Sequence, residues 1–321
     1  MSERAVKMPL DAADVCEWRS ASGMSRTSIT VCVCTYRRAE LLGRLLFELS
    51  TQETAGRFCY SIVVADNDRQ ESAREIVAQF SRRASVTTTY CVEVEQNVAL
   101  ARNKALEHAR GDYIAFIDDD EFPVVDWLVR MLRACEQFKV DGVLGPVRPF
   151  FAEPPPAWLI KSGLCERPEH QTGRLLNWRE TRTGNVLFRR GILDGNEAPF
   201  RREFGNGGED QDFFRRMMRA GHRFAWCNEA IVYEVVPPAR CRRRYFFKRA
   251  LRRGQNERLF LSTRSIVKSL LAVPAYAALL PVMGVLGQAA LMDCSVRLLG
   301  HVGKLLGAIG IGVVRGKYLS S

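Results

Sequence analysis

Apolar runs alternate with polar, helix-spaced segments through the first half of the chain and predict a repeating strand–helix unit. The β-branched and apolar residues at 28–35 indicate a strand, and apolar positions at helical spacing over 39–50 indicate a helix. The alternation recurs along the chain, with strands expected at 60–65, 86–94 and 113–117 and helices at 71–80, 98–109 and 126–138. Such alternation is typical of an α/β fold with a mostly parallel sheet and helices on both faces.

The pattern changes after this half. Prolines, glycines and tryptophans interrupt it over 142–182, and we expect a long loop region there. Regular patterns resume after residue 182. They predict strands at 184–189, 224–227 and 230–235, and a helix that starts within 205–214 and runs to Ala220.

The last part of the chain is basic and then apolar. Residues 240–253 contain eight Lys and Arg side chains with aromatic residues between them, and residues 269–292 contain no charge at all. A run of this length could cross a bilayer core of about 30 Å. Because prolines and glycines interrupt it, and because His301 and Lys304 interrupt a second apolar stretch at 298–314, an interfacial helical hairpin is a serious alternative.

The net charge of +11 belongs to this tail. Residues 236–321 hold 15 Lys and Arg against two acids, which leaves 32 basic and 34 acidic side chains in residues 1–235. We therefore expect the basic tail to contact anionic lipid headgroups, and we expect no nucleic-acid partner, since the remainder offers no recognisable reading module.

The ten cysteines show no CxxC pair, so neither a zinc site nor a disulfide framework is indicated, and a reducing compartment is favoured. Residues 1–27 are interrupted by charges and lack the apolar stretch of a secretory signal. We expect the catalytic part to lie in the cytoplasm.

Three adjacent carboxylates, Asp118, Asp119 and Asp120, follow the strand expected at 113–117. Open α/β sheets bind ligands at the carboxyl ends of their strands. Carboxylates packed this closely either raise one another's pKa or recruit a cation, and oxygen ligands suit Mg²⁺ or Mn²⁺. A solvated Asp-rich turn is the simpler alternative.

Other polar groups follow neighbouring strands, so one crevice would collect them. Thr35, Tyr36 and Arg38 lie at the end of the first strand, and Asp66 and Asn67 follow the second. A further acidic pair, Glu209 and Asp210, follows a glycine-rich lead-in, where a carboxylate could act as a general base or simply stabilise a helix N-terminus.

Five short motifs in order resemble the family 2 glycosyltransferases of GT-A fold. They are Val31–Arg38, Val63–Asn67, Gln96–Asn103, Ile117–Glu121 and Gly208–Asp212, and the resemblance spans about residues 28–235. It implies an enzyme that transfers a sugar from a nucleotide-sugar donor, with a UDP-sugar as the first expectation. The acceptor would be a hydroxyl of a glycan or of a lipid-linked molecule, and transfer would invert the anomeric centre. The implied setting is bacterial surface polysaccharide or glycolipid assembly.

The resemblance also implies roles for single residues. The donor-binding residues would be Thr35, Tyr36, Arg38, Asp66, Asn67, Arg102, Asp118 and Asp119, with Asp66 at the base and Arg102 near the diphosphate. Asp118 and Asp120 resemble the DXD motif, in which Asp120 holds a divalent cation, Mn²⁺ or Mg²⁺. Asp210, next to Glu209, resembles the catalytic base.

The chain departs from the family pattern in three places. The segment around Arg102 lacks the usual glycine, and Glu234 stands where many members place a His, so it is either a metal ligand or structural. The Gln-Xaa-Xaa-Arg-Trp motif of processive synthases is absent, which favours addition of a single sugar.

We therefore expect an N-terminal extension at 1–27, a GT-A domain at 28–240 with a nucleotide half to about 148 and an acceptor half from about 149, and a membrane-associated tail at 241–321. The expected location is the cytoplasmic face of the inner membrane. A catalytically inactive sugar-nucleotide-binding membrane scaffold and a nucleotidyltransferase are the alternatives, although the latter usually carries a glycine-rich phosphate loop that 35–38 lacks.

Overall fold

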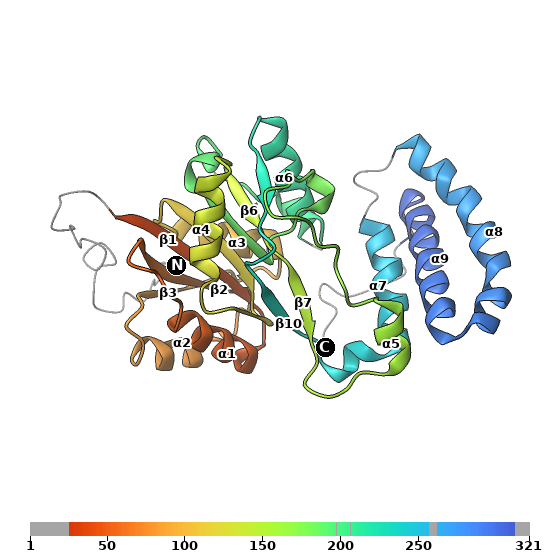
Figure 1. Cartoon of the computed structure of the whole chain (residues 1–321), viewed down its shortest axis with the longest axis horizontal. Coiled ribbons are helices and arrows are strands. Elements are labelled where there is room, and N and C mark those ends of the chain that lie inside the picture. The colour runs from red at the N-terminus through yellow and green to blue at the C-terminus, as the bar shows by residue number, and fades with distance from the viewer. Residues whose placement is uncertain (1–25, 197, 206, 257–261, 312–321) are drawn as a thin grey trace. The chain divides into compact units, whose positions relative to one another are not determined.

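The computed structural model describes residues 26–196, 198–205, 207–256 and 262–311 (Figure 1). These residues form two compact units. The first takes the described parts of Met1–Arg148, Arg167–Gly205 and Glu209–Glu234, and the second takes those of Pro149–Glu166, Asn206–Gly208 and Val235–Ser321. Residues 1–25 of the expected extension and 312–314 of the second apolar stretch lie outside the described residues.

A seven-stranded sheet forms the centre of the first unit. Its strands are β1 (Thr27–Thr35), β2 (Phe58–Asp66), β3 (Thr88–Val92), β4 (Tyr113–Asp118), β6 (Gly142–Leu144), β8 (Asn185–Arg189) and β9 (Phe224–Trp226), in the order β3-β2-β1-β4-β8-β6-β9. The paired strands are parallel except β8, which runs antiparallel to β4 and β6. The expected mostly parallel α/β sheet is confirmed.

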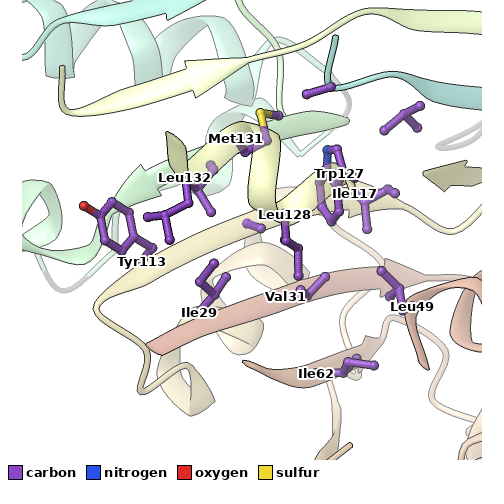
Figure 2. Packing of buried hydrophobic residues seen from close by; sticks show 14 of the residues in the cluster. Ile29, Val31, Leu49, Ile62, Tyr113, Ile117, Trp127, Leu128, Met131 and Leu132 are labelled. Atoms are coloured by element: carbon purple, nitrogen blue, oxygen red, sulfur yellow. The ribbon is translucent and has the colours of Figure 1, made fainter. Parts of the chain in front are cut away.

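Helices cover both faces of this sheet. They are α1 (Ala39–Ser50), α2 (Arg74–Ser81), α3 (Val98–His108), α4 (Trp127–Gln137) and α6 (Glu209–Arg219). Successive strand side chains point to opposite faces, so Val31 and Val33 pack with α1, α2 and α4, whereas Cys32 packs with α3 and α6. Figure 2 shows Leu128 of α4 beside Val31.

A second, three-stranded sheet has the order β5-β10-β7, formed by β5 (Glu121–Pro123), β10 (Val232–Val235) and β7 (Val147–Phe150). The expectation of a long loop over 142–182 was wrong in part, because this region contains β6, β7 and the short helix α5 (Ala157–Ser162). Short 3₁₀ helices occur at Trp178–Glu180, Arg190–Leu193, Arg202–Phe204 and Pro238–Cys241.

The second unit is mainly helical, with α5, α7 (Arg243–Asn256), α8 (Thr263–Leu286) and α9 (Gln288–Ala308). Leu159, Phe246 and Met292 form its buried apolar cluster. Glycines bring the backbones of α7 and α9 together, since a Cβ at Gly254 would lie 2.3 Å from the carbonyl oxygen of Gly300.

The apolar run at 269–292 is not one helix. Gly287, with φ of 116°, separates α8 from α9 and adopts a backbone conformation that L-residues rarely reach. Within the described residues, α8 is the helix that is long and apolar enough to cross a membrane by length and composition.

Candidate active site

The carboxyl ends of three parallel strands carry three of the predicted site residues. Thr35 at the end of β1 pairs in register with Asp66 at the end of β2, and Cys34 of β1 pairs with Asp118 at the end of β4. The register therefore brings side chains far apart in sequence to one edge of the sheet, as expected for ligand sites in open α/β sheets.

Asp119 is held by the last residue of β1 and by a residue shortly after the strand. Its carboxylate accepts a hydrogen bond of 2.8 Å from the Thr35 hydroxyl and one of 2.9 Å from the Arg38 guanidinium. The same Arg38 nitrogen lies 3.1 Å from Asp120. Burial, opposed by Arg38, raises the pKa of Asp119 to about 6. Thr35 and Arg38 thus fix the orientation of the acidic triplet.

Arg102 of α3 joins the acidic triplet to the start of α6. Its guanidinium contacts the Glu209 carboxylate and lies 3.8 Å from the Asp118 carboxylate. Both Arg102 and Glu209 are buried, with 8% of each side chain exposed. Burial raises the pKa of Glu209, and Arg102 opposes this shift. This buried pair holds the Arg102 guanidinium beside Asp118, and the role of Arg102 near a diphosphate stays a prediction.

Two glutamates face each other across the small sheet. Glu121 of β5 is the register partner of Glu234 of β10, a like-charge juxtaposition that is unfavourable unless a cation balances it. The Arg167 guanidinium contacts Glu234 and lies 4.0 Å from Glu121. The buried Glu121 Oε1 has no hydrogen-bond partner, and burial raises the pKa of this carboxyl.

Gly184 leaves room beside these carboxylates. A Cβ at this position would lie 2.8 Å from Glu121 Oε1 and 3.0 Å from Asp118 Oδ2. Contacts below 3.0 Å force a neighbouring atom to move. Any larger residue at 184 would therefore fill the space that the acidic groups share.

The donor atoms at this edge suit a hard divalent cation. The acidic cluster offers only oxygen ligands, from Asp118, Asp120, Glu121 and Glu234. The space beside Gly184 borders this cluster, and so does the Glu121 oxygen that has no hydrogen-bond partner. In the described residues, no group of three His, Cys, Asp or Glu side chains converges closely enough to hold a metal as it stands. The chemistry of the residues fits an Mn²⁺ or Mg²⁺ ion.

The residues after β2 are largely occupied by the fold itself. The buried Asp66 carboxylate accepts hydrogen bonds from the backbone of Asp68 and Ala73 and from the Tyr90 hydroxyl. The Asn67 amide donates to the carbonyls of residues 93 and 95 and accepts from the backbone of residue 97. These two side chains shape the loop at the edge of the sheet.

Tyr36 is half-buried directly after β1, and the neighbouring Arg37 lies over its ring at 5.2 Å. Arg37 has a positive φ of 54° and donates to Asp68 at 2.9 Å. The backbone therefore leaves the extended conformation of β1 at Arg37.

The start of α6 presents two acids in different settings. Glu209 is buried against Arg102, whereas Asp210 is half-buried and accepts a hydrogen bond of 2.7 Å from the backbone of Gln211. Gly207 and Gly208 precede them with φ of 120° and 97°, values that glycine reaches without strain. The glycines thus allow the turn that presents Asp210 at the helix N-terminus.

Three residues of this cluster were not among the sequence-predicted site residues: Glu121, Arg167 and Gly184. Glu121 directly follows the aspartate triplet, so its position was a usable signal. Arg167 lies in the irregular region, 67 positions from its partner Glu234. No local pattern indicates that contact.

Comparison with known proteins gives the family. The family model described as glycosyl transferase family 2 matches residues 30–197. The succinoglycan biosynthesis protein ExoM of Rhizobium meliloti (strain 1021) is 35% identical over 241 residues, which are 74% of this chain and 76% of ExoM. The chondroitin synthase of Escherichia coli is 25% identical over 246 residues, which cover 66% of this chain and 35% of the synthase.

Solved structures share the fold. The mannosyltransferase PcManGT from Pyrobaculum calidifontis, solved in complex with GDP-Man and Mn²⁺, has a TM-score of 0.54 at 19% identity and covers 90% of this chain and 77% of its own. TarS from S. aureus has a TM-score of 0.53 at 15% identity, over 87% of this chain and 55% of its own. The fold is GT-A, and the chain is a glycosyltransferase that belongs to glycosyl transferase family 2.

Proposed function

We propose that this enzyme transfers one sugar from a nucleotide-sugar donor to an acceptor hydroxyl, with inversion, in the assembly of a bacterial surface polysaccharide or glycolipid. The observation that carries the proposal is the cluster at the carboxyl edge of the sheet. There the acidic triplet Asp118–Asp120 begins at the last residue of β4. Arg38 pairs with Asp119 and Asp120, and Arg102 lies near Asp118 and pairs with Glu209 of α6.

The donor would bind along the ends of β1, β2 and β4. Thr35, Tyr36 and Arg38 would contact the nucleotide, Asp66 and Asn67 would shape the base end, and Arg102 would face the diphosphate. We place a UDP-sugar first, as the motif resemblance implies. A GDP-sugar is included because PcManGT was solved with GDP-Man.

A divalent cation would be held by Asp120 and Asp118, with Glu234 nearby. The Mn²⁺ in the PcManGT complex supports this assignment. When bound, such an ion supplies positive charge that offsets the charge developing on the leaving diphosphate. Arg102 supplies a second, permanent positive charge on the same side, held in place by Glu209.

Asp210 is the proposed general base. Its carboxylate would accept the proton of the acceptor hydroxyl as that oxygen attacks the anomeric carbon from the face opposite the diphosphate. Glu209 is committed to Arg102, so we assign it a positioning role beside the base. The different burial of these two neighbours supports the division of labour.

The acceptor would be a growing glycan or a lipid-linked sugar at the cytoplasmic face of the inner membrane. The similarity to a succinoglycan biosynthesis protein supports a polysaccharide acceptor. The apolar α8 and the basic α7 support a membrane location. The chain would thus work where lipid-linked intermediates are exposed.

The test is a panel of sugar nucleotides, with Mn²⁺, Mg²⁺ or chelator, measured by calorimetry on the wild type and on Asp120→Ala. We expect one donor to bind with a cation requirement that the variant loses. Arg57→Met is the matched control, because Arg57 forms an exposed ion pair with Glu136 in the same unit. Binding that is equal with cation and with chelator would contradict the metal assignment.

Donor binding with no transfer of the sugar to any acceptor would favour the sugar-nucleotide-binding scaffold, and failure of every donor with folded wild-type protein would contradict the proposal. Release of pyrophosphate from a nucleoside triphosphate and a sugar phosphate, with formation of the sugar nucleotide, would favour the nucleotidyltransferase. Donor binding, sugar transfer and pyrophosphate release, measured together, separate the three functions.

A further inference from the structure

The outward surface of α8 is apolar over most of its length. From Leu270 to Leu286 its exposed residues are aliphatic side chains, prolines and a glycine, and Leu271 and Val285 are 70% and 88% exposed. Only 6% of its most apolar window is buried within the described structure. Soluble monomers rarely leave an apolar surface of this size in water.

The length of α8 is compatible with two placements in a membrane. Its 24 residues give about 36 Å at 1.5 Å per residue, enough to cross a hydrocarbon core. The same helix could instead lie in the plane of the surface, with its apolar side in the boundary between headgroups and acyl chains. Its partner α9 distinguishes these placements.

Helix α9 turns back along α8 after Gly287. The Ser269 hydroxyl pairs with the His301 ring at 3.0 Å, and the Cys294 thiol lies 3.5 Å from the carbonyl oxygen of Tyr276. These contacts align Cys294 with Tyr276 and His301 with Ser269. The stretch of α9 between 294 and 301 therefore lies beside the first half of the apolar run of α8.

Charged side chains occupy that part of α9. Asp293 and Arg297 form an ion pair of 2.8 Å, with 42% and 59% of their side chains exposed. If α8 crossed the bilayer, the ion pair of Asp293 and Arg297 would lie near the centre of the bilayer and would be exposed to lipid. Ionisable side chains at that depth normally face a protein interior or a water-filled cavity.

The prolines of α8 leave two backbone carbonyls without their helical hydrogen-bond donor. Pro274 and Pro281 lie inside the helix and lack a backbone N–H. The carbonyls four residues earlier, at Leu270 and Ala277, thus lose their usual helical donor. Water at a membrane surface could satisfy them, and in a crossing helix a neighbouring helix or a Ser or Thr side chain could do so, so the prolines are compatible with both placements.

We propose that α8 lies in the plane of an anionic phospholipid surface, with its outward face in the acyl boundary and the charged side chains of α9 at headgroup level. Within 262–311 the basic residues Arg264, Lys268, Arg297 and Lys304 outnumber the single acid Asp293, which matches an anionic surface. The inference extends the proposed membrane location and does not depend on the transfer chemistry.

Depth measurements along one face of α8 test the orientation. Leu271, Ala278 and Val285 are spaced by seven residues, so they share a face, and all three are exposed. An encoded fluorescent amino acid is placed at each in turn in the full chain. Its emission is then quenched by nitroxide lipids labelled near the headgroup or deep in the acyl chain, in phosphatidylcholine vesicles containing phosphatidylglycerol.

An in-plane helix gives the same quenching depth at all three positions, with the shallow quencher the more effective. A crossing helix places 278 deep and 271 and 285 shallow, and that profile would overturn the proposal. Met283 lies on the partly covered side of α8. If the outward face is the embedded one, a label at Met283 should have a smaller quenching depth than a label at Val285.

Vesicle binding tests the surface itself. Leu271→Glu should lower partitioning of the protein into these vesicles by roughly tenfold or more, because burial of a charge replaces burial of an apolar side chain. Leu175→Glu, at an equally apolar residue that is 54% exposed in the first unit, should leave partitioning unchanged. Equal partitioning of wild type and Leu271→Glu would contradict the assigned face.

Phosphatidylcholine vesicles without phosphatidylglycerol should bind more weakly, and added salt should weaken binding to the anionic vesicles. Absence of binding to any vesicle would overturn the proposal. Donor turnover measured on the same sample then shows whether the transferase function survives independently.

Discussion

The buried pair of Arg102 and Glu209 links the donor side of the site to the start of α6, and its removal has a predictable effect on stability. Arg102→Met keeps a side chain of similar length beside the Phe200 ring, which the guanidinium carbon approaches at 5.6 Å from the ring centre. It leaves Glu209 buried without its cation. Since Glu209 Oε2 already lacks a hydrogen-bond partner, we expect a loss of about 3–5 kcal/mol in the free energy of unfolding.

Glu209→Gln is expected to cost less. Arg102 would keep Asp118 at 3.8 Å, and a glutamine oxygen can still accept a hydrogen bond. We expect a loss of about 1.5–3 kcal/mol, comparable to that of one hydrogen bond to a charged group. The double variant removes both buried charges, so its loss should be smaller than the sum of the single losses by about 1–3 kcal/mol.

Urea unfolding of the wild type, the two single variants and the double variant gives the four free energies. Arg57→Met, which breaks an ion pair with 42% and 41% of its side chains exposed, should cost less than about 1 kcal/mol. Additive losses in the cycle, or a loss for Arg102→Met no larger than that of Arg57→Met, would refute the reasoning that this pair is buried and coupled.

Three further predictions concern the same edge of the sheet. Gly184→Ala should lower kcat/KM by roughly 100-fold with little change in Tm, because its Cβ would displace Glu121 and Asp118; unchanged kinetics would contradict the close approach. Arg167→Met should tighten Mn²⁺ binding in electron paramagnetic resonance titrations, since it removes positive charge from the acidic cluster, and weaker binding would contradict this. Burial raises the pKa of Asp66, so the wild type should lose stability relative to Asp66→Asn as pH rises from about 4 to about 7; a parallel pH dependence of the two urea midpoints would contradict the burial effect.

The sequence predicted the elements whose burial follows a simple period. The helix expected at 39–50 matches α1 residue for residue, because Leu42, Leu45, Leu46 and Leu49 form one fully buried stripe. β6 and β7 were missed because they are only three and four residues long and lie among prolines. Short strands depend on their partners in the sheet more than on their own composition.

The site was predictable where it follows strand ends. Thr35, Asp66 and Asp118 come together because parallel strands end at one edge, which the strand–helix order already implied. The pairing of Arg167 with Glu234 was not predictable, since it depends on an antiparallel register and on a contact 67 residues apart. The hydrogen bonds of the Asn67 amide were not predictable for the same reason, since their partners lie 26 to 30 residues away along the chain.

Asp210 is the base that we propose for sugar transfer at this edge of the sheet. The wild type and Asp210→Asn are each given the donor identified by the binding panel, Mn²⁺ and a lipid extract as acceptor. Release of the nucleoside diphosphate and the affinity for the donor are then measured for both proteins. We predict that the variant binds the donor as well as the wild type and that its turnover falls by about 10²–10⁴-fold. Turnover equal to that of the wild type would contradict the assigned base and the mechanism built on it.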